Sequence, residues 1–346
     1  MTKETSIVNL LFSAALAALF CLCSCTEKQH TTDPEPENLP IGFRPMSQAV
    51  WVKSSPLSEF HDDFGVWGIA RELINTPYIL WERNSFMKVT KPDNSEVYVP
   101  DEDAYWLNGY EYTFLAVAPY TNSGVTPTFT LADATATPPT KDAVSFTYNL
   151  GDKYNLRNTS NNSKDHLEFD LMAAVAKSGK IGAVKPTSQD LTFWHLFTKI
   201  NINVKFVDAS GNERAGVGTV SEMRLKNVDT EGFYELSFND GNALAVACTS
   251  NHTSAQRNLT FSSGTETLHI IPQVISDFEL YLDFTLDGAS YRDFKINLAV
   301  TNNPTEYKYN DQYNWNISIS PKAAIGFMVT VSPWAEEKVG DDNVIL

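Results

Sequence analysis

Three of the four cysteines in this chain, Cys21, Cys23 and Cys25, lie within five positions of one another. Thiolates at such short spacing are typical of zinc sites and of disulfide-rich frameworks, but both arrangements need partners elsewhere in the chain. The only other cysteine is Cys248. A four-cysteine zinc site and a multi-disulfide framework are therefore excluded, and the role of the cluster must come from the residues around it.

The residues upstream predict export. Residues 7–22 (IVNLLFSAALAALFCL) form an almost unbroken apolar run behind a short polar start that contains Lys3. This layout is typical of a bacterial signal peptide, and the run is short for a membrane-spanning helix, which needs roughly 20 apolar residues. Residues 22–25 (LCSC) resemble a lipobox, in which a small residue precedes the cysteine that receives diacylglycerol. We therefore expect a lipoprotein signal peptide over residues 1–24, with lipid on Cys25; the alternative is an ordinary signal peptide with incidental cysteines.

The remaining residues that could do chemistry do not form a catalytic pattern. The sequence has no Gly-x-Ser-x-Gly elbow, phosphate-binding glycine loop or His-Glu-x-x-His helix, and His195, within LTFWHLF, is interpreted as a structural histidine. Acidic pairs such as Asp62 and Asp63 are interpreted as solvated turns, since none has the spacing of a calcium loop. Tyr105 and Trp106, with Tyr110, either form a sugar-binding platform or pack in the core of a sandwich. We expect no enzymatic activity, cofactor or metal.

Charge restricts the possible partners. The formal net charge is −16, and removal of residues 1–24 leaves it unchanged because Lys3 and Glu4 cancel. Nucleic acid and anionic lipid surfaces both require a basic face, so this balance argues against them. Residues 25–39 are polar and contain prolines, which predicts a flexible tether at a membrane surface.

Apolar residues alternate with polar ones over four stretches of the second half of the chain: 200–206, 278–286, 294–300 and 325–331. Apolar residues at every second position predict strands with one buried and one solvent-exposed face, and the turn-rich links between them favour an antiparallel β-sandwich. Residues 112–118 and 143–148 predict strands in the first half. Glycine, proline and serine cluster over residues 182–189, so we place an N-terminal domain at 40–185 and a C-terminal domain at 186–346.

Several segments, taken in order, resemble the fimbrillin family of Bacteroidetes, the lipoprotein precursors of type V pilus subunits. After the lipobox these segments are FGVWGI (64–69), YWLNGYEYTFLAVAPY (105–120), FDLMAAVA (169–176), LTFWHLFTKINI (191–202), LHIIPQ (268–273) and IGFMVTVSPWAE (325–336). The resemblance covers nearly all of the chain after Cys25. It implies an all-β protein with two transthyretin-like β-sandwich domains and no enzymatic activity.

The resemblance also implies a route of assembly. In the family a trypsin-like protease cuts the lipidated precursor after its first strand, that strand departs, and a strand of another subunit replaces it. Here residues 40–52 match the first strand, and Lys53 matches the cleavage position better than Arg44, the other basic candidate. Because the family site is usually arginine, a lysine puts cleavage by an arginine-specific protease in doubt. The expected buried residues of the removable strand are Ile41, Phe43, Val50 and Val52.

The matching donor strand lies near the C-terminus, with Ile325, Phe327, Val329 and Val331 as its apolar set; the alternative is that this strand closes the sheet of its own domain. The resemblance thus predicts a structural subunit of a cell-surface fimbria that supports adhesion. Its partners would be other fimbrial subunits, a processing protease and, before processing, the outer membrane through Cys25. The other hypothesis is a monomeric surface lipoprotein that binds glycans.

Overall fold

Every regular element that the structure describes is a β-strand. The computed structural model describes residues 39–47, 63–72, 77–81, 86–120, 126–150, 171–238, 244–250, 256–261, 264–298, 303–320 and 325–333. The chain divides into two compact units, residues 1–39 and residues 40–346, and all the strands lie in the second. The predicted all-β class is confirmed. No helix among the described residues is long and apolar enough to cross a membrane.

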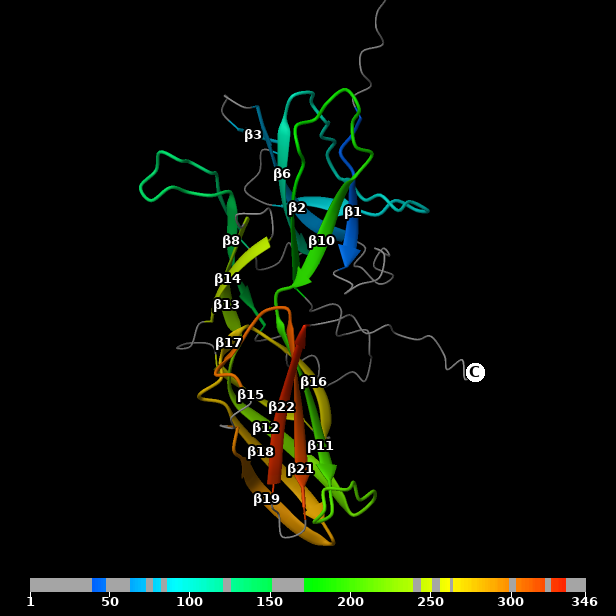
Figure 1. Ribbon diagram of the computed structural model, residues 1–346, viewed down its shortest axis with the longest axis vertical. Helices are drawn as coiled ribbons and strands as arrows, with labels where there is room; N and C mark the ends of the chain where they lie inside the picture. Colours follow the sequence, from blue (N-terminus) through cyan, green and yellow to red (C-terminus); the bar gives the residue numbers. More distant parts are fainter. Residues whose placement is uncertain are drawn as a thin grey trace, which may run out of the picture. The chain divides into compact units, whose positions relative to one another are not determined.

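The largest sheet contains the first strand of the fold. Its order is β1-β10-β9-β6-β2-β4-β5, with β3 also paired to β2. Figure 1 labels β1, β10, β6, β2 and β3 of this sheet. Residues 64–70 of β2 and 112–118 of β6 are buried on both faces, which explains why their sequences are almost continuously apolar. The strands are β1 (Phe43–Ser47), β2 (Asp63–Arg71), β3 (Tyr78–Ile79), β4 (Met87–Thr90), β5 (Val99–Pro100), β6 (Glu111–Ala118), β9 (Met172–Lys177) and β10 (Gln189–His195).

A second sheet, of order β14-β13-β8-β7, combines strands that are far apart in the sequence. Phe129 of β7 lies 4.8 Å from Trp67 of β2, ring centre to ring centre, so this sheet packs against the first one. Strand β13 starts directly after β12 (Gly218–Asp229), with only Thr230 between them. Since β12 belongs to another four-stranded sheet, β15-β12-β18-β19, the two consecutive strands join that sheet to this one. The strands are β7 (Thr128–Thr130), β8 (Ala143–Asn149), β13 (Glu231–Phe238) and β14 (Leu244–Ser250).

The third and fourth sheets form the other sandwich, with orders β16-β11-β21-β22 and β15-β12-β18-β19. The ring centres of Phe206 in β11 and Phe284 in β18 lie 6.0 Å apart between them. The strands are β11 (Thr198–Phe206), β16 (Thr265–Ile270), β21 (Asp311–Ile319) and β22 (Ile325–Pro333) in one sheet, and β12 (Gly218–Asp229), β15 (Gln256–Phe261), β18 (Glu279–Leu286) and β19 (Ala289–Ile296) in the other. A short pair, β17 (Gln273–Val274) and β20 (Glu306–Tyr307), completes the fold.

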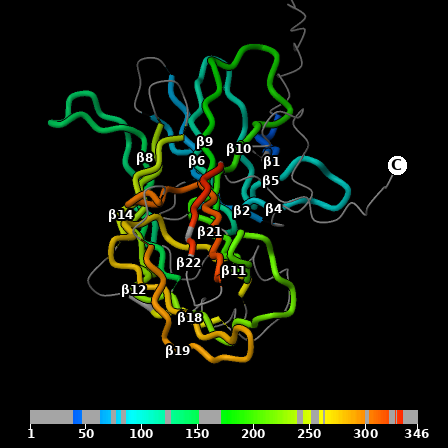
Figure 2. The backbone as a smooth tube through the Cα atoms, turned by 60° about the horizontal axis from the view of Figure 1, so that its bottom comes forward, coloured from blue at the N-terminus to red at the C-terminus, as the bar shows by residue number. Residues whose placement is uncertain are grey.

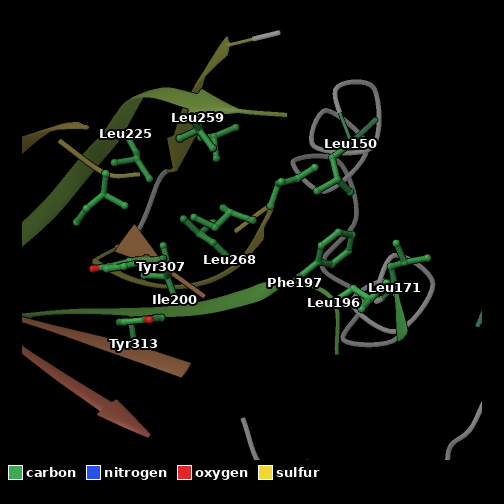
Figure 3. Packing of buried hydrophobic residues seen from close by; sticks show 14 of the residues in the cluster. Leu150, Leu171, Leu196, Phe197, Ile200, Leu225, Leu259, Leu268, Tyr307 and Tyr313 are labelled. Atoms are coloured by element: carbon green, nitrogen blue, oxygen red, sulfur yellow. The ribbon is translucent and has the colours of Figure 1, made fainter. Parts of the chain in front are cut away.

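Buried side chains form one large cluster and a separate aromatic group. The cluster runs through both sandwiches and is continuous where β10 passes into β11, at Leu196 and Phe197 (Figure 3). The aromatic group lies on the other face of β2 and β6, around Phe64 and Phe114, and does not belong to that cluster. The first strand, β1, contributes to this second group.

Candidate functional site

Strand β1 forms backbone hydrogen bonds with both ends of the first sheet. It pairs in parallel with β10, in the register Phe43 to Gln189 through Ser47 to Phe193. On its other side the backbone N–H of Ile41 donates to the carbonyl oxygen of Ala104 at 2.7 Å, and Phe43 exchanges two 2.8 Å hydrogen bonds with Tyr98. Tyr98 directly precedes β5, so β1 connects the two ends of the sheet order (Figure 2). Residues 40 and 41 thus pair with the segment that follows β5, residues 42 and 43 are held between two backbones, and residues 44–47 pair with β10.

The apolar side chains of β1 fill the aromatic group. Ile41 and Phe43 have no exposed surface. The ring of Phe43 meets those of Phe114 and Phe64 edge-on, at centroid distances of 5.1 and 6.1 Å. Phe193 of β10 lies 5.5 Å from Phe64 and extends the same group. If residues 40–47 left the fold, the space that they vacate would be an apolar groove with unpaired backbone on both walls.

Gly42 is the tightest position of this strand. A Cβ atom there would run into the Val97 side chain and would stand 3.5 Å from the carbonyl oxygen of Tyr98 and 3.6 Å from that of Thr187. Glycine in a strand often marks such a close approach of another backbone. Sequence reasoning missed Gly42, although a glycine between two apolar strand residues was the available signal.

Arg44 and Pro45 face in different directions. The guanidinium group of Arg44 binds both carboxylate oxygens of Asp190 in β10, at 2.8 and 3.1 Å, and this contact raises the pKa of Arg44. Pro45 has no N–H to donate. Since the carbonyl of Gly42 accepts a hydrogen bond from Gln189 while Phe43 bonds on the other side, the nitrogen of Pro45 points away from β10. The proline therefore interrupts no bond of the β1–β10 ladder, in keeping with a strand at the end of a sheet.

The other residues expected in this region fall outside the described structure. Cys25, Val50, Val52 and Lys53 belong to residues that the structure does not describe, so lipidation and the main cleavage site remain predictions.

The aromatic residues that were candidates for a sugar platform differ in exposure: Trp106 is buried, Tyr110 is half-buried and Tyr105 is exposed. Trp106 is fully buried and packs edge-on against Tyr112, with ring centres 4.8 Å apart. Its indole Nε1 is buried without a hydrogen-bond partner. Tyr105 is 39% exposed, and its hydroxyl donates to Asp103 at 3.3 Å. Trp106 is thus a core residue, and no platform forms around it.

The candidate donor strand, β22, is an edge strand. It pairs antiparallel with β21 along its whole length, from Ile325 opposite Ile319 to Pro333 opposite Asp311. Val329 is buried, whereas Val331 is 47% exposed. The side chains of Ile325 and Phe327 lie outside the described part of the chain.

Within the described residues, no group of three or more histidine, cysteine, aspartate and glutamate side chains could hold a metal ion. His195 is buried, and its backbone N–H donates to the side-chain oxygen of Asn310 at 3.3 Å. Burial raises the pKa of the Cys248 thiol to about 12, which makes this residue an inert thiol at neutral pH.

Comparison with known proteins places this fold in a family. A chain from Bacteroides uniformis described as a cell adhesion protein aligns with a TM-score of 0.52 at 15% identity, over 87% of this chain and 100% of that one. A similarly described chain from Bacteroides ovatus aligns at 0.46 and 18% identity, over 86% and 99%. A fimbrial assembly protein from Parabacteroides distasonis aligns at 0.41 and 12%, over 85% and 98%.

At these identities the Bacteroides uniformis structure supports the fold alone, and the other two add no argument. No curated protein sequence matches the chain significantly. The family model described as fimbrillin-like matches residues 59–334, which is most of the sequence. The chain therefore belongs to the fimbrillin-like family.

Proposed function

We propose that this protein is a structural subunit of a cell-surface fimbria that supports adhesion and polymerises by strand exchange. The precursor is exported as a lipoprotein with lipid on Cys25, and a protease cuts after Lys53. The first strand then departs with the lipid, and a strand of another subunit fills the groove. Family membership supports the fimbrial role. The observation that carries the assembly route is the position of β1 at the end of its sheet order, where Ile41 and Phe43 are buried and the backbone bonds to β10 and to Tyr98.

The energetics favour replacement of a lost strand. Ile41 and Phe43 have no exposed surface, and full burial of an aliphatic or aromatic side chain stabilises by ~1.5–3 kcal/mol, so these two contribute roughly 3–6 kcal/mol. A whole domain is stable by only ~5–15 kcal/mol. Loss of β1 also leaves the N–H of Tyr98 and of Gln189 without their backbone acceptors. An emptied subunit is therefore strongly driven to bind a new strand, whose backbone restores these bonds.

The proposed partners follow from this route. They are other fimbrial subunits, a processing protease that cuts after a basic residue, and the outer membrane before processing. The net charge of −16 disfavours nucleic acid. The role of the subunit is mechanical, with no enzymatic step.

Mild proteolysis tests the proposal. The full-length chain is exported, extracted in mild detergent and treated with trypsin, and the products are separated by size and sequenced from their N-termini. We expect a ladder of oligomers whose subunits begin at Ser54. Lys53→Ala should remain a monomer, whereas Arg44→Ala should polymerise normally and serves as the matched control. Subunits that have lost residues 40–53 but stay monomeric and folded would overturn the proposal.

A further inference from the structure

Amide side chains gather on the outer face of the sheet β16-β11-β21-β22. In the parallel ladder between β11 and β21, which lie side by side in Figure 1, Asn201 is opposite Asn314 and Asn203 is opposite Asn316. Both strands are interior strands of the sheet. The intervening residues of both strands are buried in the core, so the amides face outward. The amide patch consists of Asn201, Asn203, Thr267, Gln312, Asn314 and Asn316.

Hydrogen bonds fix the orientation of one row of the patch. The hydroxyl of Thr267 in β16 donates to Asn201 Oδ1 at 3.0 Å, and Asn201 Nδ2 donates to Asn314 Oδ1 at 2.8 Å. Gln312 Nε2 also donates to Asn314 Oδ1, at 3.2 Å. Both lone pairs of that oxygen are therefore used. The Asn314 amide nitrogen is left as an oriented donor that has no acceptor among the described residues.

The second row of the patch has more unused capacity. Asn203 makes no side-chain hydrogen bond within the described part of the chain, and Asn316 Nδ2 makes one long bond, of 3.5 Å, to the carbonyl oxygen of Asn314. Each amide has two N–H donors and one carbonyl acceptor. Because neighbouring strands lie about 5 Å apart, donors and acceptors stand side by side at that spacing. Such a surface matches a ligand whose groups both donate and accept, as hydroxyl groups do.

The patch is uncharged, although the chain has a formal net charge of −16. No aspartate or glutamate occurs among the described outward positions of β11, β16 and β21. Lys199 and Lys205 flank the patch, but Lys199 is buried, and Lys205 pairs with Glu213 at 3.0 Å. The patch therefore favours an uncharged ligand, since it offers an ionic one neither a carboxylate nor an unpaired ammonium group.

The opposite face of the same sandwich is built differently. On the outer face of β15-β12-β18-β19, Arg224 pairs with Asp283 at 2.5 Å and Lys295 pairs with Glu279 at 2.6 Å. Ion pairs are thus the way in which this chain covers the other sheet. Asparagine is depleted in strands. The asparagines of two interior strands, β11 and β21, weaken those strands and add nothing to the core, so binding explains their position better than folding does.

Other classes of ligand fit the patch less well. The cores of protein–protein interfaces are enriched in aromatic residues, methionine and arginine, and no member of the patch is of these types. Nucleic acids and anionic lipid surfaces need a basic face. A neutral polysaccharide carries hydroxyl groups along an extended chain, and its chemistry matches a flat array of amides.

We propose that the amide patch binds a neutral polysaccharide, whose hydroxyl groups exchange hydrogen bonds with the amides of β11 and β21. This inference names the ligand class for the adhesive role in the proposed function and rests on that role, but it does not depend on strand exchange. A flat polar surface makes few bonds to each sugar, so one subunit should bind weakly. A fibre with a patch on every subunit should bind tightly through multivalency.

Affinity electrophoresis tests the ligand class. The uncut full-length chain is run in native gels that contain mannan, dextran or laminarin as neutral probes, or polygalacturonate as an anionic probe. We expect at least one neutral polysaccharide to retard the chain and polygalacturonate to leave its mobility unchanged. Retardation by none of the neutral probes, or equal retardation by polygalacturonate, would overturn the inference.

Substitutions within the patch test its location. Asn203→Thr combined with Asn316→Thr should weaken the apparent affinity at least about fivefold, because the amide hydrogen bonds are lost. The urea midpoint should not fall, since threonine favours strands more than asparagine does. Thr285→Val is the matched control, because it changes an exposed position on the outer face of β18, and it should bind normally. Retardation that the double substitution leaves unchanged would show that the ligand binds elsewhere.

The same preparations separate this inference from the proposed function. If trypsin yields no ladder but the uncut chain is retarded, the proposed assembly fails and the amide patch stands. If a ladder forms and neither it nor the uncut chain is retarded, only the amide patch fails. Self-association of the uncut chain in sedimentation, abolished by the double substitution, would identify a second copy as the occupant and would also overturn the inference.

Discussion

Replacement of Phe43 by alanine tests the claim that the first strand holds the precursor together. The Phe43 ring has no exposed surface and contacts Phe64 and Phe114 edge-on. Truncating a buried phenylalanine to alanine costs ~3–5 kcal/mol, which includes the lost transfer free energy and the cavity that remains. Against a domain stability of ~5–15 kcal/mol, we expect Phe43→Ala to remove roughly a fifth or more of the free energy of unfolding.

Urea unfolding of the intact precursor, followed by tryptophan fluorescence, measures this loss. Arg44→Ala is the matched control, because Arg44 is the next residue of the same strand and the side chains of its ion pair with Asp190 are 43% and 49% exposed. An exposed pair contributes below about 1 kcal/mol. If Phe43→Ala lowers the free energy of unfolding no more than Arg44→Ala does, the first strand is not a structural part of the fold and the groove argument is refuted.

Three further predictions follow from the described residues. Gly42→Ala should lower the free energy of unfolding by ~1–3 kcal/mol in the same assay, and adding Val97→Ala should recover most of the loss; a double variant as unstable as Gly42→Ala would contradict the close contact. The backbone N–H of Asp293 donates to the Asp283 carboxylate and lowers the pKa of Asp283. This carboxylate therefore stabilises the fold at pH values above its ordinary pKa of about 4, and the stabilisation is lost as the pH falls through the lowered pKa. Asp283→Asn should therefore be less stable at neutral pH and lose less stability on acidification, which urea midpoints between about pH 6 and pH 2 will show. Cys248, a partly buried thiol with its pKa raised to about 12, should resist iodoacetamide in the folded chain near pH 8 and react in denaturing urea, and equal labelling in both would refute the raised pKa.

Local sequence patterns predicted strands well where one face of the strand is buried and the other is exposed. The alternation at residues 200–206 and 325–331 lies within β11 and β22, and that at residues 278–286 contains β18. The alternation at 294–300 was less informative, because β19 runs from Ala289 to Ile296 and thus begins earlier. Asp287 and Gly288 both have positive φ, at 49° and 79°, and form a tight turn that starts the returning strand directly after β18.

The pairing of distant strands could not be read from local patterns. Strand β10 follows the cluster of glycine and proline at residues 182–189, yet it pairs with β1 and β9. Strand β13 pairs with β8 over seven positions, although about 80 residues separate them in the sequence. Such ladders depend on which apolar faces meet in space, and period-two patterns are the same for any partner. The expected halves 40–185 and 186–346 thus share backbone hydrogen bonds in two sheets.

The walls of the groove around β1 also could not be predicted from local sequence patterns. The sequence indicated Ile41 and Phe43 as apolar residues of one strand, but not that residues 98–104 would form the second wall of their groove. The bonds from Ile41 to Ala104 and between Phe43 and Tyr98 link segments about 60 residues apart. The role of Gly42 depends on Val97 in that wall, so it becomes visible only when the wall is known.

The proposed exchange also bears on which basic residue is processed. Arg44 lies within β1, and its backbone is part of the ladder with β10, so a protease must first open the strand to reach it. A cut after Arg44 would leave residues 45–47, which pair with Leu191 to Phe193, attached to the body of the protein through the chain leading to β2. Those residues would continue to occupy the part of the groove beside β10 that an incoming strand needs. A cut after Lys53 clears the whole of β1. The strand exchange proposed above therefore requires cleavage beyond Ser47, a requirement that Lys53 meets and Arg44 does not.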